Sequence, residues 1–234
     1  MNTEMSTHGH NCVLLFARSP TRGQVKTRLA AEIGEESAAG LYKCFVEDSV
    51  SLIESLDAER KVCYHPAEAK SEFSGWLGEQ HRYAPQQGDN LGERLKNAFS
   101  DAFGKGFAKV AAIGSDSPDL PVEFLQQAFG ELASHDTVIG PSSDGGYYLI
   151  GFSRSSFLPD AFDNIAWGSD AVFEQTVCML RQHGLTVRLL PLWHDIDTAA
   201  DLKSLLLRTK NTPFEKSKTY LCLKSDGLWS ALNV

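Results

Sequence analysis

Short apolar runs alternate with segments of helical periodicity along this chain, and this alternation constrains its fold more than any other feature. Residues 13–16 are continuously apolar, as in a strand that is buried on both faces of a sheet. Residues 37–56 then place leucine and phenylalanine at helical spacing, and residues 61–64 and 82–84 have the composition of further strands. The alternation predicts the α/β class: a three-layer α/β/α sandwich around a mostly parallel, mixed sheet.

The second half of the chain continues this pattern. Residues 110–113 are predicted to form a central strand that ends in Gly-Ser-Asp. Residues 137–139 and 147–150 are predicted strands on either side of an Asp-Gly-Gly turn, and residues 187–190 form a late strand.

Four helix starts are marked by their capping residues. Ser169 is expected to cap a helix that has Val172 and Leu180 on one side. Asn90, with Glu93 three positions later, has the spacing of a capping box. Thr198 precedes the last helix that we predict, and Asp119 is expected to cap a helix that begins near Pro121.

The chain shows no division into separate units. It contains no internal repeat, no low-complexity stretch and no linker. We therefore predict one domain over residues 12–210, with a mobile tail at 1–11 and a C-terminal extension at 211–234 that packs on the same domain.

The net charge of −8 at pH 7 excludes some classes of partner. An acidic surface repels nucleic acid and anionic membranes, so an anionic ligand must be attracted by a local positive cluster. No apolar run reaches the roughly 18 residues that a bilayer span needs, and no signal peptide is visible. The five cysteines are widely spaced and odd in number, which indicates reduced thiols in a cytoplasmic protein. We expect no nucleic-acid or membrane partner, and the oligomeric state stays open.

A basic loop directly follows the first predicted strand. Residues 18–28 contain four cations, Arg18, Arg22, Lys26 and Arg28, and no acid. Ligands of open α/β sheets gather beyond the carboxyl ends of strands, and a glycine such as Gly23 lets the backbone approach phosphate closely. The loop is neither a Walker A motif nor a dinucleotide fingerprint, because valine precedes the lysine and G-x-G-x-x-G is absent. The pattern predicts a phosphate-binding loop; a solvated basic loop is the alternative.

Acidic residues follow the later predicted strands. Asp116 ends the central strand segment and can present a carboxylate to Mg²⁺, although a turn-forming aspartate has the same pattern. Asp195 and Asp197 are two positions apart in an extended segment, and we expect only one of them to face a given metal ion. Asp144 precedes two glycines, which favours a hairpin turn and also suits close contact with a ligand.

Five ordered motifs resemble those of one superfamily. They are FARSPTRGQVKTRL, QGDNLGER, IGSDSPDLP, GPSSDGGYYLIG and DIDTAADL. Together they resemble the nucleotide-diphospho-sugar transferase superfamily with its GT-A-type fold, and within it a bacterial family provisionally assigned as glycosyltransferases of unknown acceptor. A more distant resemblance is to phospholactate guanylyltransferase and the molybdenum-cofactor guanylyltransferases. The likeness covers about residues 12–207, and Phe-Ala-Arg replaces the Leu-x-Gly-Gly opening of many nucleotidyltransferases.

This resemblance implies three sets of site residues. The nucleotide would be bound by Ala17, Arg18, Pro20, Gly23, Lys26, Arg28, Gln87, Gly88, Asp89, Gly92 and Ser115. The metal ion, Mg²⁺ or Mn²⁺, would be bound by Asp116 and Asp197, with Asp195 in reserve. The sugar or acceptor would contact Asp144, Gly145, Gly146, Tyr147 and Trp167. The catalytic residues would be Lys26, Arg28, Asp116 and Asp144.

Three functions are compatible with these patterns. A glycosyltransferase would move a sugar from a nucleotide sugar to a small acceptor with the help of Mg²⁺. A guanylyltransferase-like nucleotidyltransferase would couple a nucleoside triphosphate to a phosphorylated acceptor and release pyrophosphate. A nucleotide-sensing module would bind without turnover. The loop's charge favours a triphosphate, whereas the narrower resemblance favours glycosyl transfer, which we expect.

Overall fold

The computed structural model of this chain describes residues 11–225. Residues 1–10 and 226–234 lie outside the described residues, so most of the predicted tail and the end of the predicted extension are not part of this account.

A seven-stranded sheet forms the centre of the molecule, with the order β3-β2-β1-β4-β6-β5-β7. Its strand β6 is antiparallel to both of its neighbours, and all other neighbouring pairs are parallel. The predicted mostly parallel, mixed sheet is therefore confirmed. The strands are β1 (Asn11–Arg18), β2 (Glu59–His65), β3 (Arg82–Pro85), β4 (Lys109–Ile113), β5 (Thr137–Pro141), β6 (Tyr147–Ser153) and β7 (Val187–Leu189).

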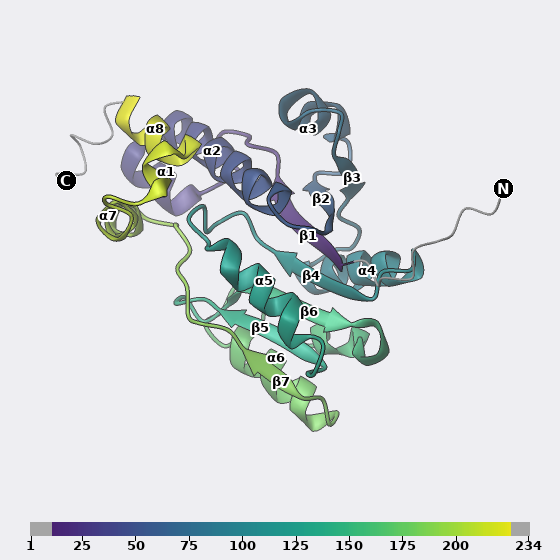
Figure 1. The fold of residues 1–234 in the computed structure, drawn as a ribbon. Helices are drawn as coiled ribbons and strands as arrows, with labels where there is room; N and C mark the ends of the chain where they lie inside the picture. The colour runs from purple at the N-terminus through teal and green to yellow at the C-terminus, as the bar shows by residue number, and fades with distance from the viewer. Residues whose placement is uncertain (1–10, 226–234) are drawn as a thin grey trace.

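Helices cover both faces of the sheet, as the three-layer prediction requires (Figure 1). One face packs against α1, α2, α3, α5, α7 and α8, and the other against α4 and α6. The helices are α1 (Thr27–Ile33), α2 (Glu35–Glu54), α3 (Lys70–Leu77), α4 (Leu91–Gly104), α5 (Val122–Glu131), α6 (Val172–Gln182), α7 (Ala199–Arg208) and α8 (Lys218–Ser225).

Strand β1 shows why two separate cores form. Side chains alternate between the faces of a strand, so Val13 and Leu15 enter the core beneath α2 while Cys12 and Leu14 enter the core beneath α4. All four side chains are almost fully buried. Among residues 11–225, no helix is long and apolar enough to cross a bilayer.

The order of the strands determines where a ligand can bind. The chain moves from β1 outward through β2 to β3, and then returns to place β4 on the other side of β1. Open α/β sheets bind ligands at such a reversal, beyond the carboxyl ends of the two central strands. The loop after β1 and the segment after β4 are therefore brought together at this edge.

The caps predicted at Asn90 and Thr198 are confirmed, and those predicted at Asp119 and Ser169 are wrong. Ser169 lies two positions before Ala171, the N-cap residue of α6, and no side chain among residues 11–225 caps that helix. Thr198 and Asp201 form a complete capping box at the start of α7, as the sequence indicates. Asn90 Oδ1 accepts a hydrogen bond from Glu93 N at 3.0 Å, which confirms Asn90 as the N-cap of α4. The capping role of Asp119 is wrong, because its carboxylate accepts two hydrogen bonds from Arg208, at 2.7 and 2.9 Å. Arg208 is 89 positions away and offers a charged, bidentate partner that a local backbone N–H does not.

Candidate active site

A cavity of about 670 Å³ opens at the carboxyl ends of β1 and β4. Apolar side chains such as Phe16 and Ile150 form part of its wall. Eight of the residues that the sequence predicts for the site line it: Arg18, Lys26, Asp89, Ser115, Asp116, Tyr147, Trp167 and Asp197. Five separate parts of the chain, residues 18–26, 89, 115–116, 147–167 and 197, therefore meet around one space.

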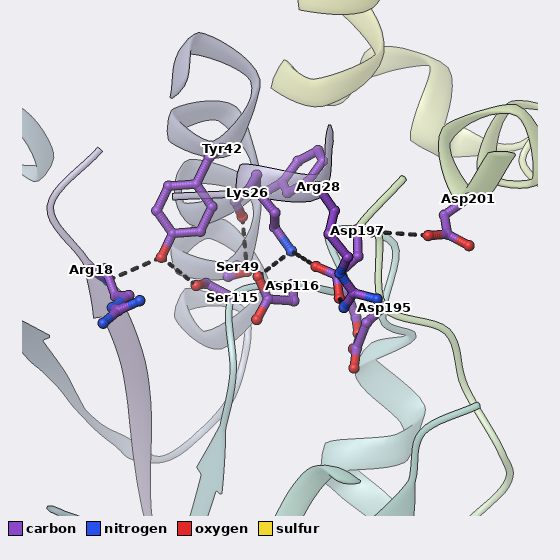
Figure 2. Close-up of polar contacts among 12 residues, drawn as sticks. Arg18, Lys26, Arg28, Tyr42, Ser49, Ser115, Asp116, Asp195, Asp197 and Asp201 are labelled. Carbon is purple, nitrogen blue, oxygen red and sulfur yellow. Dashed lines mark hydrogen bonds and ion pairs between the residues drawn. The ribbon is translucent and has the colours of Figure 1, made fainter. Parts of the chain in front are cut away.

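Lys26 connects two of these segments (Figure 2). Its side chain is only 3% exposed, and its Nζ atom forms ion pairs with Asp116 Oδ1 and with Asp197 Oδ1, the latter at 2.9 Å. Burial alone would lower the pKa of Lys26, but the two carboxylates raise it above its usual range, so the ammonium stays charged. Two acids that the sequence predicts as metal ligands thus converge on one cation.

The backbone at Lys26 is itself unusual. The residue immediately precedes α1 and has φ 48° and ψ 45°, a left-handed conformation that costs a non-glycine residue about 1 kcal/mol or more. Its carbonyl accepts the hydrogen bond of Ala30 N at 2.7 Å, and this bond begins the helix. The strained conformation therefore turns the loop into the helix while the side chain points toward the two aspartates.

Asp197 has a second basic partner. Arg28 Nη2 lies 2.5 Å from Asp197 Oδ2. Burial would raise the pKa of Asp197, but the positive charges of Lys26 and Arg28 and the hydrogen bond from Lys26 hold that pKa below its usual range. The carboxylate is therefore ionised at neutral pH.

Asp195 has different surroundings, although it is two positions from Asp197. Its two carboxylate oxygens accept hydrogen bonds from the hydroxyls of Ser117 and Ser142, each at 2.7 Å. Burial and the charge of Asp116 raise the pKa of Asp195 to about 6. Between the two aspartates, Ile196 N donates to the Asp116 carbonyl at 2.9 Å, which fixes this segment beside the end of β4. Asp195 does not belong to the cavity lining of the described residues.

Tyr42 is a cavity residue that the sequence analysis missed. The side chain comes from α2, and its hydroxyl accepts a hydrogen bond from Arg18 N at 2.9 Å and lies 2.9 Å from Ser115 Oγ. Burial raises the pKa of the phenol, so Tyr42 stays protonated and joins the ends of β1 and β4. No local motif surrounds it, since it lies on a helical face with ordinary core spacing.

Arg94 is the second missed residue. It lies in the first turn of α4 and lines the cavity, and its Nε donates to the Gly88 carbonyl at 3.0 Å. The signal for it was the QGDNLGER motif, from which only the residues before Glu93 were assigned.

Two further residues of that motif, Gln87 and Gly92, do not line the cavity. Gln87 is exposed, and its carbonyl accepts from Asn97 Nδ2 at 2.9 Å. A Cβ atom at Gly92 would lie 2.5 Å from the Phe162 carbonyl oxygen and 2.7 Å from Trp167 Nε1, so only glycine fits between α4 and these residues.

The Asp-Gly-Gly segment forms the turn of the β5–β6 hairpin. Asp144 is exposed, and its Oδ1 accepts from Gly146 N at 2.9 Å. Gly145 has φ +89°, which glycine adopts without strain. Tyr147 leads from this turn into the cavity and meets Trp167 edge to face, with ring centroids 6.3 Å apart.

The structure does not bring every predicted site residue to the cavity. Within the described part of the chain, the following do not line it: Ala17, Pro20, Gly23, Arg28, Gln87, Gly88, Gly92, Asp144, Gly145, Gly146 and Asp195. Their roles toward a ligand stay predictions.

The residues present fit a divalent cation held by two carboxylates. Asp116 and Asp197 approach one point closely enough to share the ammonium of Lys26, and carboxylate oxygens are ligands that Mg²⁺ prefers. In residues 11–225 there is no group of three or more His, Cys, Asp or Glu side chains arranged to hold a metal ion. Further ligands would have to come from water or from a bound phosphate, as is common for Mg²⁺.

The fold and this arrangement define a protein of the nucleotide-diphospho-sugar transferase fold. A family model described as "Uncharacterized protein conserved in bacteria (DUF2064)" matches residues 49–169. The chain belongs to this family. A comparison with curated proteins finds no match.

Solved structures support the nucleotide-diphospho-sugar transferase fold. A crystal structure from Desulfovibrio desulfuricans G20, of a protein provisionally described as a nucleotide-diphospho-sugar transferase, is 45% identical to this chain, with a TM-score of 0.90. The match covers 95% of this chain and 96% of that chain. The predicted resemblance to this superfamily is thereby confirmed.

Two more distant structures share the fold. Molybdopterin-guanine dinucleotide biosynthesis protein A from Archaeoglobus fulgidus is 14% identical, with a TM-score of 0.51 over 83% of this chain and 95% of that chain. CMP:2-keto-3-deoxy-manno-octonic acid synthetase, solved in complex with CTP, is 10% identical, with a TM-score of 0.52 over 86% of this chain and 98% of that chain. At these identities the likeness concerns the fold alone.

Proposed function

We propose that this protein is a Mg²⁺-dependent glycosyltransferase that moves a sugar from a nucleotide sugar to a small acceptor. The observation that carries the proposal is the ion-paired cluster of Lys26, Asp116 and Asp197 at the wall of a cavity large enough for a small-molecule substrate. Such a cluster can hold a cation beside a phosphate group, which is what departure of a nucleoside diphosphate requires.

The cluster supplies both signs of charge at one place. Lys26 supplies the positive charge, and the two aspartates supply the negative charge. When a bound cation draws on the two carboxylates, the Lys26 ammonium can bind a phosphate oxygen. Asp116 is 47% exposed and Asp197 27%, so solvent and ligands can reach both carboxylates. A Mg²⁺ ion bound to these aspartates would neutralise charge on the departing diphosphate.

The aromatic part of the cavity lining suits the sugar or acceptor. Tyr147 and Trp167 present aromatic surface there, and an aromatic ring can stack on the apolar face of a sugar. Asp144 is our candidate for the base that removes the acceptor proton, because it is exposed and lies three residues before Tyr147 in the same hairpin. Because Asp144 does not line the cavity, either a conformational change or an acceptor that extends out of the cavity would have to bring the Asp144 carboxylate and the acceptor hydroxyl together.

Nucleotidyl transfer is the second candidate, and ion pairing in the loop weakens the charge argument for it. Arg22 pairs with Glu36, while Lys26 and Arg28 pair with the aspartates, so the four basic side chains do not all face the cavity as free cations. Less free positive charge suits a diphosphate better than a triphosphate. The likeness in fold to a synthetase that was solved in complex with CTP keeps nucleotidyl transfer as the alternative.

Product analysis with the purified chain distinguishes these functions. Nucleotide sugars and nucleoside triphosphates would each be incubated with Mg²⁺ and a panel of small hydroxyl and phosphate acceptors. Release of a nucleoside diphosphate from a nucleotide sugar, lost in Asp116→Ala, supports the proposal. Release of pyrophosphate from a triphosphate supports nucleotidyl transfer instead. Tight nucleotide binding with no product from either class would identify a sensing module.

A further inference from the structure

Two arginines face the cavity away from the Lys26 cluster. Arg18 is the last residue of β1, and Arg94 comes from α4, so they approach the same space from different layers. Within residues 11–225 neither guanidinium forms an ion pair, whereas Arg22, Lys26 and Arg28 all do. Asp89 also lines the cavity, yet it is not paired with either arginine in the described structure.

Both guanidiniums belong to the lining of one cavity, in a part that we call the arginine corner, and the charges of both act on His65. His65 is the register partner of Arg18 in the parallel β1–β2 pair. Its pKa is lowered first by burial and then by the positive charges of Arg94 and Arg18. The negative charge of Glu68 acts on His65 in the opposite sense, but within residues 11–225 Glu68 forms no ion pair with either arginine.

Both guanidiniums have donors left for a ligand. Arg94 uses Nε to hold the Gly88 carbonyl, which leaves its terminal N–H groups for other acceptors. Arg18 is exposed, and its hydrogen bond to the Tyr42 hydroxyl uses its backbone N–H rather than its side chain. Two planar guanidiniums without an acidic partner are the arrangement that binds an oxyanion through paired hydrogen bonds.

Tyr42 lies between Arg18 and the Lys26 cluster. Figure 2 shows Arg18 on one side of the tyrosine ring, and Lys26 with Asp116 on the other. The Tyr42 hydroxyl, held between Arg18 N and Ser115 Oγ, fixes the boundary. An anion bound to the arginines would therefore occupy a different place from a phosphate bound at Lys26.

We propose that Arg18 and Arg94 form a second oxyanion subsite, which binds a phosphate group of the substrate at a place distinct from the Lys26 cluster. The inference rests on the proposed function and deepens it: the substrates together carry a phosphate beyond the one that Lys26 and the aspartates hold. That phosphate belongs either to the nucleotide donor or to a phosphorylated acceptor.

Calorimetric titration with inorganic phosphate tests the subsite directly. Arg18→Gln and Arg94→Gln each remove a charge, and glutamine at position 94 can still donate to the Gly88 carbonyl. Each variant should weaken phosphate binding about tenfold or more, because a charge-assisted hydrogen bond is lost. Lys96→Gln is the matched control, since Lys96 lies on the same helix, pairs with Asp163 and should leave the affinity unchanged. Phosphate binding equal to that of the unmodified chain in both arginine variants would overturn the proposal.

Further measurements show whether the phosphate comes from the donor or the acceptor. They also distinguish failure of the subsite from failure of the proposed function. If a nucleoside diphosphate displaces bound phosphate, the subsite serves the donor; if both bind together, it serves the acceptor, and either result supports the subsite. Unchanged nucleotide-sugar turnover kinetics in both arginine variants would remove the subsite and leave the proposed function standing. Arginine-dependent phosphate binding in a chain that turns over no nucleotide sugar would keep the subsite and remove the proposed function. Melting temperatures near that of the unmodified chain show that each variant is folded, and Arg94→Lys, which keeps the charge, should recover part of the affinity.

Discussion

Lys26 and Asp197 are 171 positions apart in the sequence, and Lys26 Nζ donates to Asp197 Oδ1 at 2.9 Å. This contact joins the loop after β1 to the segment before α7, with Asp116 of the β4 end as a third member. The cluster closes one wall of the cavity and uses the same carboxylates that are suited to a divalent cation.

Replacing Lys26 by methionine tests what the cluster contributes to stability. The substitution keeps the buried apolar stem and leaves two carboxylates without their shared partner. Losing one member of a buried ion pair costs about 3–5 kcal/mol, and the partial exposure of both aspartates reduces this to about 1–3 kcal/mol. Chemical denaturation measures the change. Arg22→Met removes an exposed pair from the same loop, and a loss as large as that of Lys26→Met would contradict the account.

Asp195 makes stability depend on pH. Its folded pKa of about 6 lies above the ordinary value of 3.8 for an aspartate, so the folded state binds the proton more tightly than the unfolded state. The resulting stabilisation is complete below pH 3.8 and is lost as pH rises through about 6. Asp195→Asn cannot titrate, so the free energy of unfolding of the unmodified chain should fall relative to this variant between about pH 4 and 7. Parallel stability curves over that range would show that Asp195 is not buried as described.

Gly92 tests the packing between α4 and the cavity wall. A methyl group there would overlap the Phe162 carbonyl and the Trp167 indole, so Gly92→Ala should lower stability by about 1–3 kcal/mol and change the Trp167 fluorescence. Gly104→Ala in the same helix is the control, because nothing lies within 4 Å of its Cβ. It should be neutral or stabilise by up to about 1 kcal/mol. Equal effects of the two substitutions would argue against close packing at position 92.

Asp48 anchors the last described helix. Its carboxylate accepts hydrogen bonds from Lys218 N at 2.9 Å and Thr219 N at 2.8 Å, so a residue of α2 caps the start of α8. Asp48→Ala should cost about 1–2 kcal/mol and release the α8 amides to faster hydrogen exchange. The exchange of β1 amides provides the internal reference. Unchanged protection of α8 would mean that its apolar contacts with α2 suffice without the cap.

Features set by local sequence were predicted well. The buried strand at residues 13–16 and the helix at 37–56 follow from short-range hydrophobic pattern. The strand lies within β1, and the predicted helix agrees with α2 (Glu35–Glu54) except for its last two residues. The Thr198 cap follows from spacing alone. Helices α1 and α3 were not predicted, because seven and eight residues are too few to show a helical period.

Features set by distant contacts were not predictable in the same way. The sequence indicates that Lys26, Asp116 and Asp197 are charged site residues, but not that they bind one another. The spacing of Asp119 is that of a helix cap, but its carboxylate forms an ion pair with the distant Arg208 instead. Tyr42 and Arg94 come to the cavity only through the packing of α2 and α4 on the sheet. The hydrophobic pattern predicts where each strand ends. Which strand ends lie side by side depends on the order of the strands in the sheet, and the pattern does not give that order.

Titration of a nucleoside diphosphate into the unmodified chain and into Asp116→Asn, with and without Mg²⁺, tests the central claim most directly. The unmodified chain should bind at least about tenfold more tightly with Mg²⁺, since a metal-bridged phosphate gains charge-assisted contacts. Asp116→Asn should lose this enhancement while its melting temperature stays close to that of the unmodified chain. Equal affinity in both proteins, with no response to Mg²⁺, would contradict the account.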